Sequence, residues 1–113
     1  MNTVKMNDLA VIKNEIEKEN ALLVYFYNDD CAPCLSLRPK VEKLMINFFP
    51  KMKLTYVNSK SHPEIPAGFG VYANPAILLF FEGKECMRYS KFVSITELEE
   101  TIKRYYYMLF EED

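Results

Sequence analysis

Hydrophobic residues are arranged along this chain in two different patterns. Two short runs, Ala21–Tyr27 and Ala76–Phe81, are apolar without alternation, which is typical of strands buried on both faces of a sheet. From about 32 to 49, and again from 95 to 109, apolar residues return every three or four positions, which predicts amphipathic helices. The chain therefore alternates buried strands with helices.

Weaker patterns complete this outline. Ser94 followed by Glu97 has the form of a helix-capping box, and Pro50 ends the helix that begins at 32. Pro39 lies inside that helix and is expected to kink it. The other predicted elements are, in chain order, an edge strand at 3–5, a helix capped by Asn7 or Asp8, a strand at 52–58, a loop at 61–68, and a strand at 85–89 that the turn 82–84 joins to 76–81.

The order of these elements predicts an α/β fold, with a central mixed β-sheet flanked by helices on both faces. A chain of 113 residues can bury one hydrophobic core but not two, so we expect a single domain over residues 1–113. The net charge of −2 gives no reason to expect nucleic acid or an anionic membrane as a partner. Residues 1–8 lack the apolar core of a signal peptide, and no apolar run approaches the ~20 residues of a membrane span, so we expect a cytoplasmic protein.

The clearest chemical signal is Cys31-Ala32-Pro33-Cys34, which directly follows the first buried strand and opens the next helix. At a helix N-terminus, unpaired backbone N–H groups and the positive end of the dipole favour thiolate over thiol. Two cysteines at this spacing in this context indicate thiol–disulfide exchange, with Cys31 as nucleophile and Cys34 as resolving thiol. The same spacing also occurs as half of many zinc sites.

Two other residues bear on the metal alternative. Cys86 and His62 bring the number of possible zinc ligands to four, but no second closely spaced pair supports a site, and we expect no metal. Cys86 is expected to be a half-buried residue of its strand, and His62 a solvated loop residue. Three cysteines, an odd number, do not predict a structural disulfide framework.

Several features follow one another in a characteristic order: the strand 22–27, the pair Cys31 and Cys34 with Pro33 between them, Pro39 five residues later, Asn74-Pro75 before the strand 76–80, and the turn 82–84. Together, their order and spacing resemble those of the thioredoxin family over nearly the whole chain.

The resemblance implies a thioredoxin fold and a thiol–disulfide oxidoreductase that reduces protein disulfides through the Cys31–Cys34 dithiol, a redox-active disulfide that needs no other cofactor. It implies a cis peptide bond before Pro75, and an Asn74 backbone that pairs with an extended substrate. The expected substrate-binding residues are Ala32, Pro33, Asn74 and Pro75. The expected partners are protein disulfides and a reductase that donates electrons, neither of which the sequence names.

The chain also departs from the family pattern. Asp29-Asp30 stand where a tryptophan is usual, Tyr25 replaces a buried aspartate, Tyr56 replaces the lysine partner of that aspartate, and Lys91 falls near an expected glycine. Because a phenol is a poor base at neutral pH, we expect Tyr25 to be a core residue. The proton acceptor for Cys34 is then not identified, and water could serve.

Asp29 and Asp30 allow two interpretations. Pro33 brings no positive charge between the cysteines, so the dithiol should be a reductant rather than a strong oxidant. If Asp29 and Asp30 face Cys31, their charges raise the pKa of its thiol and act in the same direction. Alternatively, they form a solvated acidic loop that helps to cap the helix.

A second class of function stays open at this point. The departures around the dithiol are compatible with a thioredoxin-fold redox sensor or protein-interaction module whose dithiol switches binding and turns over little. Turnover of a disulfide substrate separates this alternative from a reductase.

Overall fold

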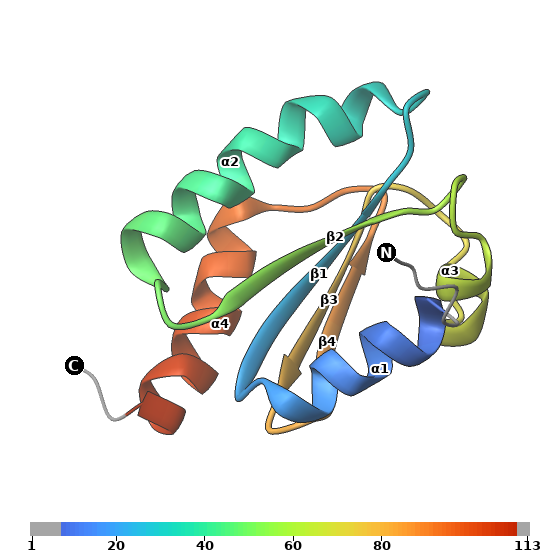
Figure 1. Ribbon diagram of the computed structural model, residues 1–113. Helices are drawn as coiled ribbons and strands as arrows, with labels where there is room; N and C mark the ends of the chain where they lie inside the picture. Colours follow the sequence, from blue (N-terminus) through green and yellow to red (C-terminus); the bar gives the residue numbers. More distant parts are fainter. Residues whose placement is uncertain (1–7, 111–113) are drawn as a thin grey trace.

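The computed structural model describes residues 8–110 as four helices and four strands (Figure 1). In chain order they are α1 (Asp8–Lys18), β1 (Ala21–Tyr27), α2 (Ala32–Phe48), β2 (Lys53–Asn58), α3 (Glu64–Phe69), β3 (Ala76–Phe81), β4 (Lys84–Ser90) and α4 (Ile95–Phe110). The two apolar runs form β1 and β3 with the predicted bounds. Within residues 8–110, no helix combines the length and the apolar character that a membrane crossing requires.

The four strands form one mixed sheet in the order β2-β1-β3-β4. β1 is parallel to β2 and antiparallel to β3, and β4 is the antiparallel neighbour of β3. The two wholly apolar strands therefore occupy the two central positions, where both faces are covered. This arrangement confirms the predicted mixed sheet.

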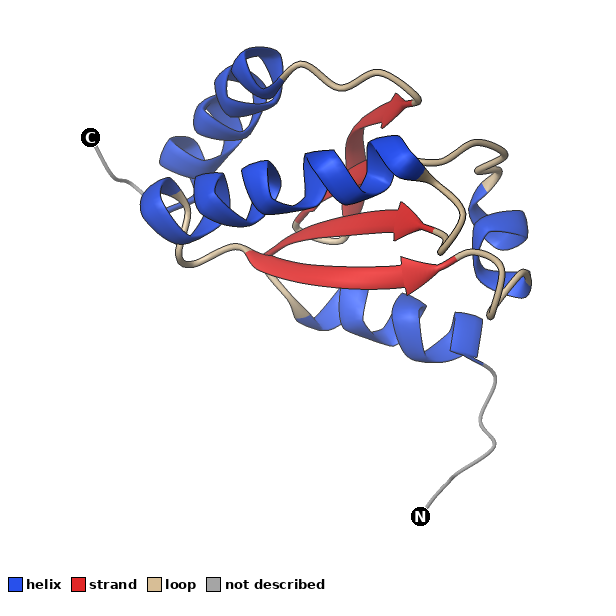
Figure 2. Cartoon of the chain, turned by 90° about the horizontal axis from the view of Figure 1, so that it is seen from above, coloured by secondary structure: helices blue, strands red, loops and turns tan. Residues whose placement is uncertain are grey.

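Helices cover both faces of the sheet (Figure 2). Alternate residues of β1 serve the two layers: Leu23 and Tyr25 join the cluster beneath α2 and α4, whereas Val24 and Phe26 join the cluster against α1 and α3. A short loop joins the C-terminus of β1 to the N-terminus of α2. The packing of these two elements therefore fixes where the Cys31–Cys34 segment lies relative to the sheet.

The segment predicted as a loop at 61–68 contains a short helix, so that prediction was wrong for α3. The sequence hides this helix because Pro63, Pro66 and Gly68 are usually breakers. Pro66 lies in the first turn, where a missing N–H removes no hydrogen bond. Ile65 is buried against the α1 side of the sheet, which gives the helix its packing.

Local signals at the other ends of elements are confirmed. The Ser94 hydroxyl accepts a hydrogen bond from the Glu97 backbone N–H at 3.2 Å and so caps α4. Glu82 and Gly83 both have positive φ, the conformation of a tight two-residue hairpin turn between β3 and β4. Pro39 lies inside α2 without ending it, and the expected kink stays a prediction. The edge strand at 3–5 and a cap at Asn7 lie outside the described residues; Asp8 is the first residue of α1.

Lys91, near the position where the family pattern led us to expect glycine, has φ 69°. A side chain in this left-handed region costs of order 1–2 kcal/mol, whereas glycine gives up about 0.5–1 kcal/mol of chain entropy on folding. We therefore expect Lys91→Gly to raise the free energy of unfolding by about 0.5–1 kcal/mol, as measured by urea denaturation. Lys91→Ala removes the same charge but keeps the Cβ, so an equal gain in that control would contradict the backbone explanation.

Candidate active site

Cys31 and Cys34 form a disulfide at the N-terminus of α2, with an S–S distance of 2.11 Å. Cys31 is the N-cap residue, and its Sγ accepts a hydrogen bond from the Cys34 backbone N–H at 3.2 Å. Cys31 is partly exposed, whereas Cys34 is only 2% exposed. A reactant in solution can therefore reach the first sulfur and not the second, as the assignment of nucleophile and resolving thiol requires.

The loop before β3 lies beside the disulfide. The Asn74–Pro75 peptide bond is cis, as the resemblance implied. Ser59 Oγ donates to Asn74 Oδ1 at 3.1 Å, and the Lys91 N–H donates to the Pro75 carbonyl at 2.8 Å. These contacts join the loop to the end of β2 on one side and to the segment after β4 on the other.

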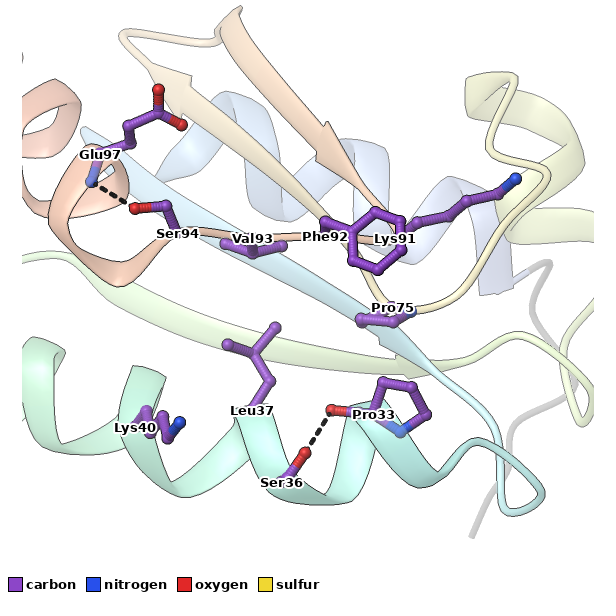
Figure 3. A pocket seen from close by; sticks show the side chains of 10 residues that line it. All are labelled: Pro33, Ser36, Leu37, Lys40, Pro75, Lys91, Phe92, Val93, Ser94 and Glu97. Carbon is purple, nitrogen blue, oxygen red and sulfur yellow. Dashed lines mark hydrogen bonds between the residues drawn. The ribbon is translucent and has the colours of Figure 1, made fainter.

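Two open hollows meet at this point. The first is lined by Cys31, Ala32, Pro33 and Asn74, among others, and the second by Pro33, Leu37, Pro75 and the chain before α4. In the second hollow, Pro33 and Pro75 face each other, and Leu37 points from α2 toward Val93 (Figure 3). All four residues expected to bind substrate thus surround the disulfide, although their role in binding stays a prediction.

Tyr25 lies beneath the disulfide and is fully buried, at 0% exposure. Its hydroxyl donates a hydrogen bond to the Cys34 carbonyl oxygen at 2.7 Å. Burial raises the pKa of Tyr25 to about 12, so the phenol is neutral at physiological pH. The expected core role is confirmed, and this position supplies no carboxylate to take a proton from Cys34.

Arg38, Glu42 and Tyr56 form a polar network next to Tyr25 that sequence reasoning missed. Tyr56 lies directly opposite Tyr25 in the β1–β2 register, and its hydroxyl donates to Glu42 Oε2. Arg38 donates to the same carboxylate oxygen at 3.3 Å, and its guanidinium lies 3.9 Å from the centre of the Tyr56 ring. The only signal in the sequence was the i,i+4 spacing of Arg38 and Glu42 on a predicted helix.

These contacts hold the charges of the network in a defined state. The hydrogen bond from Tyr56 keeps the pKa of Glu42 below its ordinary value, so Glu42 stays ionised. Burial, with the hydrogen bond to Glu42, raises the pKa of Tyr56 to about 12. Glu42, the acid of this network, is thus an anion that already accepts hydrogen bonds from Tyr56 and Arg38, and it is not a free base.

Asp30 is paired with a cation that the sequence did not suggest. Lys60 Nζ lies 2.8 Å from Asp30 Oδ2, and its hydrogen bond holds the pKa of that carboxyl below its ordinary value. Asp30 and Lys60 line the same hollow as Cys31. Asp29 and Asp30 are exposed, as the solvated-loop interpretation expected, but the capping part of that interpretation is wrong, because Cys31 is the N-cap residue and its Sγ accepts the Cys34 N–H.

This pairing changes the expected effect of charge on Cys31. In the reduced protein, Asp30→Asn leaves Lys60 unopposed and should speed alkylation of Cys31 by iodoacetamide near pH 7 about twofold, whereas Lys60→Gln should slow it by a similar factor. Both effects should shrink at high salt because both charges are exposed. Asp29→Asn is the comparison for an acid that acts on Lys60 through its charge alone, without the hydrogen bond that Asp30 makes. Equal alkylation rates in all four proteins would show that neither charge acts on the thiol.

Cys86 and His62 lie apart from the dithiol. Cys86 is partly buried on β4, as expected, and its Sγ–H donates to the Lys84 carbonyl at 3.5 Å. His62 is about half exposed, as expected, but its Nδ1 lies 2.8 Å from Asp8 Oδ2 and 4.0 Å from Glu64 Oε2. The structure therefore does not bring these two residues together with Cys31 and Cys34 as one ligand set.

Comparison with known proteins agrees with this geometry. The family model described as Thioredoxin matches residues 3–104. The chain belongs to the thioredoxin family. Thioredoxin-like protein YdfQ of Bacillus subtilis is 30% identical over 101 residues, which cover 89% of this chain and 89% of that protein. A thioredoxin of Rickettsia bellii is 28% identical over 80 residues, covering 71% of this chain and 76% of the relative.

Solved structures show the same fold. Mitochondrial thioredoxin 3 from Saccharomyces cerevisiae, in its oxidised form, superposes with a TM-score of 0.76 at 26% identity, over 85% of this chain and 89% of that one. Fasciola hepatica thioredoxin gives a TM-score of 0.73 at 33% identity, over 87% and 91%. The chain therefore has the thioredoxin fold, and family membership together with the Cys31–Cys34 pair supports thiol–disulfide oxidoreductase activity.

Proposed function

We propose that this protein reduces disulfide bonds of other proteins, with Cys31 as nucleophile and Cys34 as resolving thiol. The observation that carries the proposal is the unequal exposure of the two bonded cysteine residues at the N-terminus of α2. This difference supports attack by the partly exposed Cys31 on the substrate, followed by attack of the buried Cys34 on Cys31.

The reaction starts from the reduced dithiol. The Cys31 thiolate attacks one sulfur of the substrate disulfide, and the other sulfur leaves as a thiolate and takes a proton. Cys34 then loses its proton and attacks Cys31 Sγ, which breaks the mixed disulfide and releases the second substrate thiol. Two electrons and two protons pass to the substrate, and the protein is left with the Cys31–Cys34 disulfide, the state seen here. An external dithiol reductant must restore the reduced form.

The described residues of the site contribute in distinct ways. The helix N-terminus favours the Cys31 thiolate, and the hydrogen bond from the Cys34 N–H to Cys31 Sγ stabilises negative charge on that sulfur. The Tyr25 hydroxyl holds the Cys34 carbonyl and so the first turn of α2. We propose the backbone beside Pro75 as the surface on which an extended substrate pairs.

The direct test is catalytic turnover. The protein should accelerate the reduction of insulin by dithiothreitol in a concentration-dependent manner, followed by the turbidity of the released B chain. A variant with both Cys31 and Cys34 changed to Ser is the control and should give the uncatalysed rate. If the wild-type protein gives no more than that rate, the reductase proposal is wrong.

A second candidate function is favoured by one observation. A neutral phenol with a pKa of about 12 replaces a buried acid beneath Cys34, so nothing at that position accepts the proton that Cys34 must lose. A slow resolving step would suit a redox sensor that forms long-lived mixed disulfides. Formation of a mixed disulfide without turnover in the insulin assay would favour this candidate over the reductase.

A further inference from the structure

Arg88, on β4, forms hydrogen bonds to the backbone at the end of α3. Its Nη2 donates to the Phe69 carbonyl at 2.9 Å, and its Nη1 donates to the Gly70 carbonyl at 3.2 Å. The same guanidinium forms a two-point ion pair with Glu85, from Nε to Oε2 at 2.6 Å and from Nη2 to Oε1 at 2.8 Å. We call this pair of residues the Glu85–Arg88 clamp, because it joins β4 to the C-terminus of α3.

An irregularity in β4 puts both residues of the clamp on one side of the strand. In a regular strand, residues three positions apart point to opposite faces. In the β3–β4 register, however, two consecutive residues of β3 are paired with Met87 and Glu85, so Cys86 is the extra residue of a bulge. The extra residue reverses the alternation, and Glu85 and Arg88 can therefore form their ion pair across three positions.

The clamp holds the start of the loop at 70–75, which leads from α3 to the cis-Pro. Gly70, whose carbonyl Arg88 binds, is the C-cap residue of α3 and has φ 68°. At the other end of the loop, the Pro75 carbonyl accepts the N–H of Lys91, the residue directly after β4. The strand β4 and the residue after it thus bind both ends of this loop.

Between its two ends, the loop does not pack closely against β4. A hollow is lined by residues of the loop, of β3 and of β4, among them Val71, Tyr72 and Tyr89. Close packing would fix the loop along its whole length, since protein interiors leave little room for movement. Here the position of the loop relative to β4 depends on the hydrogen bonds at its ends.

We propose that Arg88 is a positioning residue of the reductase: the clamp fixes the loop at 70–75, and with it the backbone beside Pro75, in the place next to the disulfide that an extended substrate requires. This inference rests on the proposed function and adds two residues that touch neither the substrate nor a sulfur atom. A guanidinium suits this task because its planar set of five N–H donors can bind two carbonyls and a carboxylate at once.

The first test observes the loop and needs no turnover. The Arg88 side chain is 41% exposed, so Arg88→Met leaves no buried cavity and should fold. Backbone order parameters from ¹⁵N relaxation should be about 0.85 for Tyr72, Ala73 and Asn74 in the wild-type protein and fall below about 0.7 in Arg88→Met. The order parameters of β1 should not change. Unchanged values in the loop would overturn the inference, whatever the turnover assay gives.

The second test measures turnover of insulin with dithiothreitol. Arg88→Met should raise KM about fivefold and change kcat less than twofold, because the clamp acts on docking of the substrate and not on either sulfur. Alkylation of reduced Cys31 by iodoacetamide, which needs no docked chain, should keep its wild-type rate. Glu85→Gln should raise KM by a smaller factor, and by none in a protein that already carries Arg88→Met, because Glu85 acts through Arg88. Arg88→Lys keeps the charge without the planar donors and should restore less than half of the lost affinity.

Arg104→Met is the matched control, because Arg104 is an exposed arginine on α4, outside the clamp. It should match the wild-type protein in order parameters, KM and kcat. An unchanged KM in Arg88→Met, or a fall in kcat together with the alkylation rate of Cys31, would overturn the inference while leaving the reductase intact. A wild-type protein without insulin turnover would overturn the proposed function, and the order parameters would still show separately whether the clamp holds the loop.

Discussion

Cys34→Ser is expected to accumulate a covalent adduct between Cys31 and a substrate thiol. The first attack needs only the exposed sulfur, so it should proceed in this variant, whereas the second attack has no sulfur to perform it. Cys31→Ser should instead give no adduct at this site, because the Cys34 residue that remains there is only 2% exposed. Both variants should lower insulin turnover by about 100-fold or more, since each removes one of two obligatory bond-forming atoms.

Mass spectrometry of the Cys34→Ser protein, digested after incubation with a disulfide peptide, locates the adduct. The expected site is Cys31. Cys86→Ser is the matched control, because Cys86 is the remaining cysteine and is partly buried on β4; it should keep wild-type turnover. An adduct found mainly on Cys86 in the Cys34→Ser protein would contradict the assignment of the nucleophile.

The sequence predicted the elements that depend on repetitive burial. β1 and β3 are apolar throughout because both of their faces are covered, and their bounds followed directly from this pattern. The dithiol could be placed for the same reason, since it lies between a recognisable strand and a recognisable helix. The helix α3 was missed because it is short and only Ile65 and Pro66 of its residues are buried, within a segment rich in breakers.

Tertiary contacts of the site were beyond reach of the sequence. Lys60 meets Asp30 across 30 positions of the chain, and Tyr56 meets Glu42 across 14, so neither pair has a local signal. Tyr72 and Phe92 could not be recognised as exposed, because single aromatic residues between elements are more often buried than displayed. The sequence did single out three residues that depart from the family pattern, and the structure gives each a distinctive setting. Tyr25 and Tyr56 are paired across β1 and β2, and Lys91 has a positive φ.

A buried acid beneath Cys34 could both fill the core and accept the proton of Cys34, whereas the neutral Tyr25 does only the first. Tyr25 fills the core and fixes the backbone of α2, which is a structural task. It does not accept protons near neutral pH, since its pKa is about 12. The resolving step then depends on water or on the leaving thiolate as the proton acceptor, and its rate should rise with pH until the Cys34 thiol ionises.

The titration of Tyr25 also predicts how stability changes at alkaline pH. An unfolded tyrosine has a pKa near 10, against about 12 for the folded protein. Below pH 10 the phenol is neutral in both states, and its contribution to stability is fully present. Between pH 10 and 12 the unfolded chain releases a proton that the folded chain keeps, so stability falls as pH rises, by about 2–3 kcal/mol once the folded pKa is passed.

Tyr25→Phe isolates this contribution, because it keeps the ring in the core and removes the group that titrates. At pH 8 the variant should be less stable by about 1 kcal/mol, the worth of the hydrogen bond to the Cys34 carbonyl. The difference should shrink to about zero by pH 11. Only in the wild-type protein does the unfolded chain lose the Tyr25 proton at this pH, which stabilises the unfolded state relative to the folded state. Guanidinium unfolding of the oxidised proteins at both pH values, in a Cys86→Ser background that prevents thiol exchange, measures it. Tyr72→Phe, at a position 88% exposed, is the control and should match its parent at both pH values. A difference for Tyr25→Phe that stays near 1 kcal/mol at pH 11 would mean that the buried phenol titrates as it does in the unfolded chain.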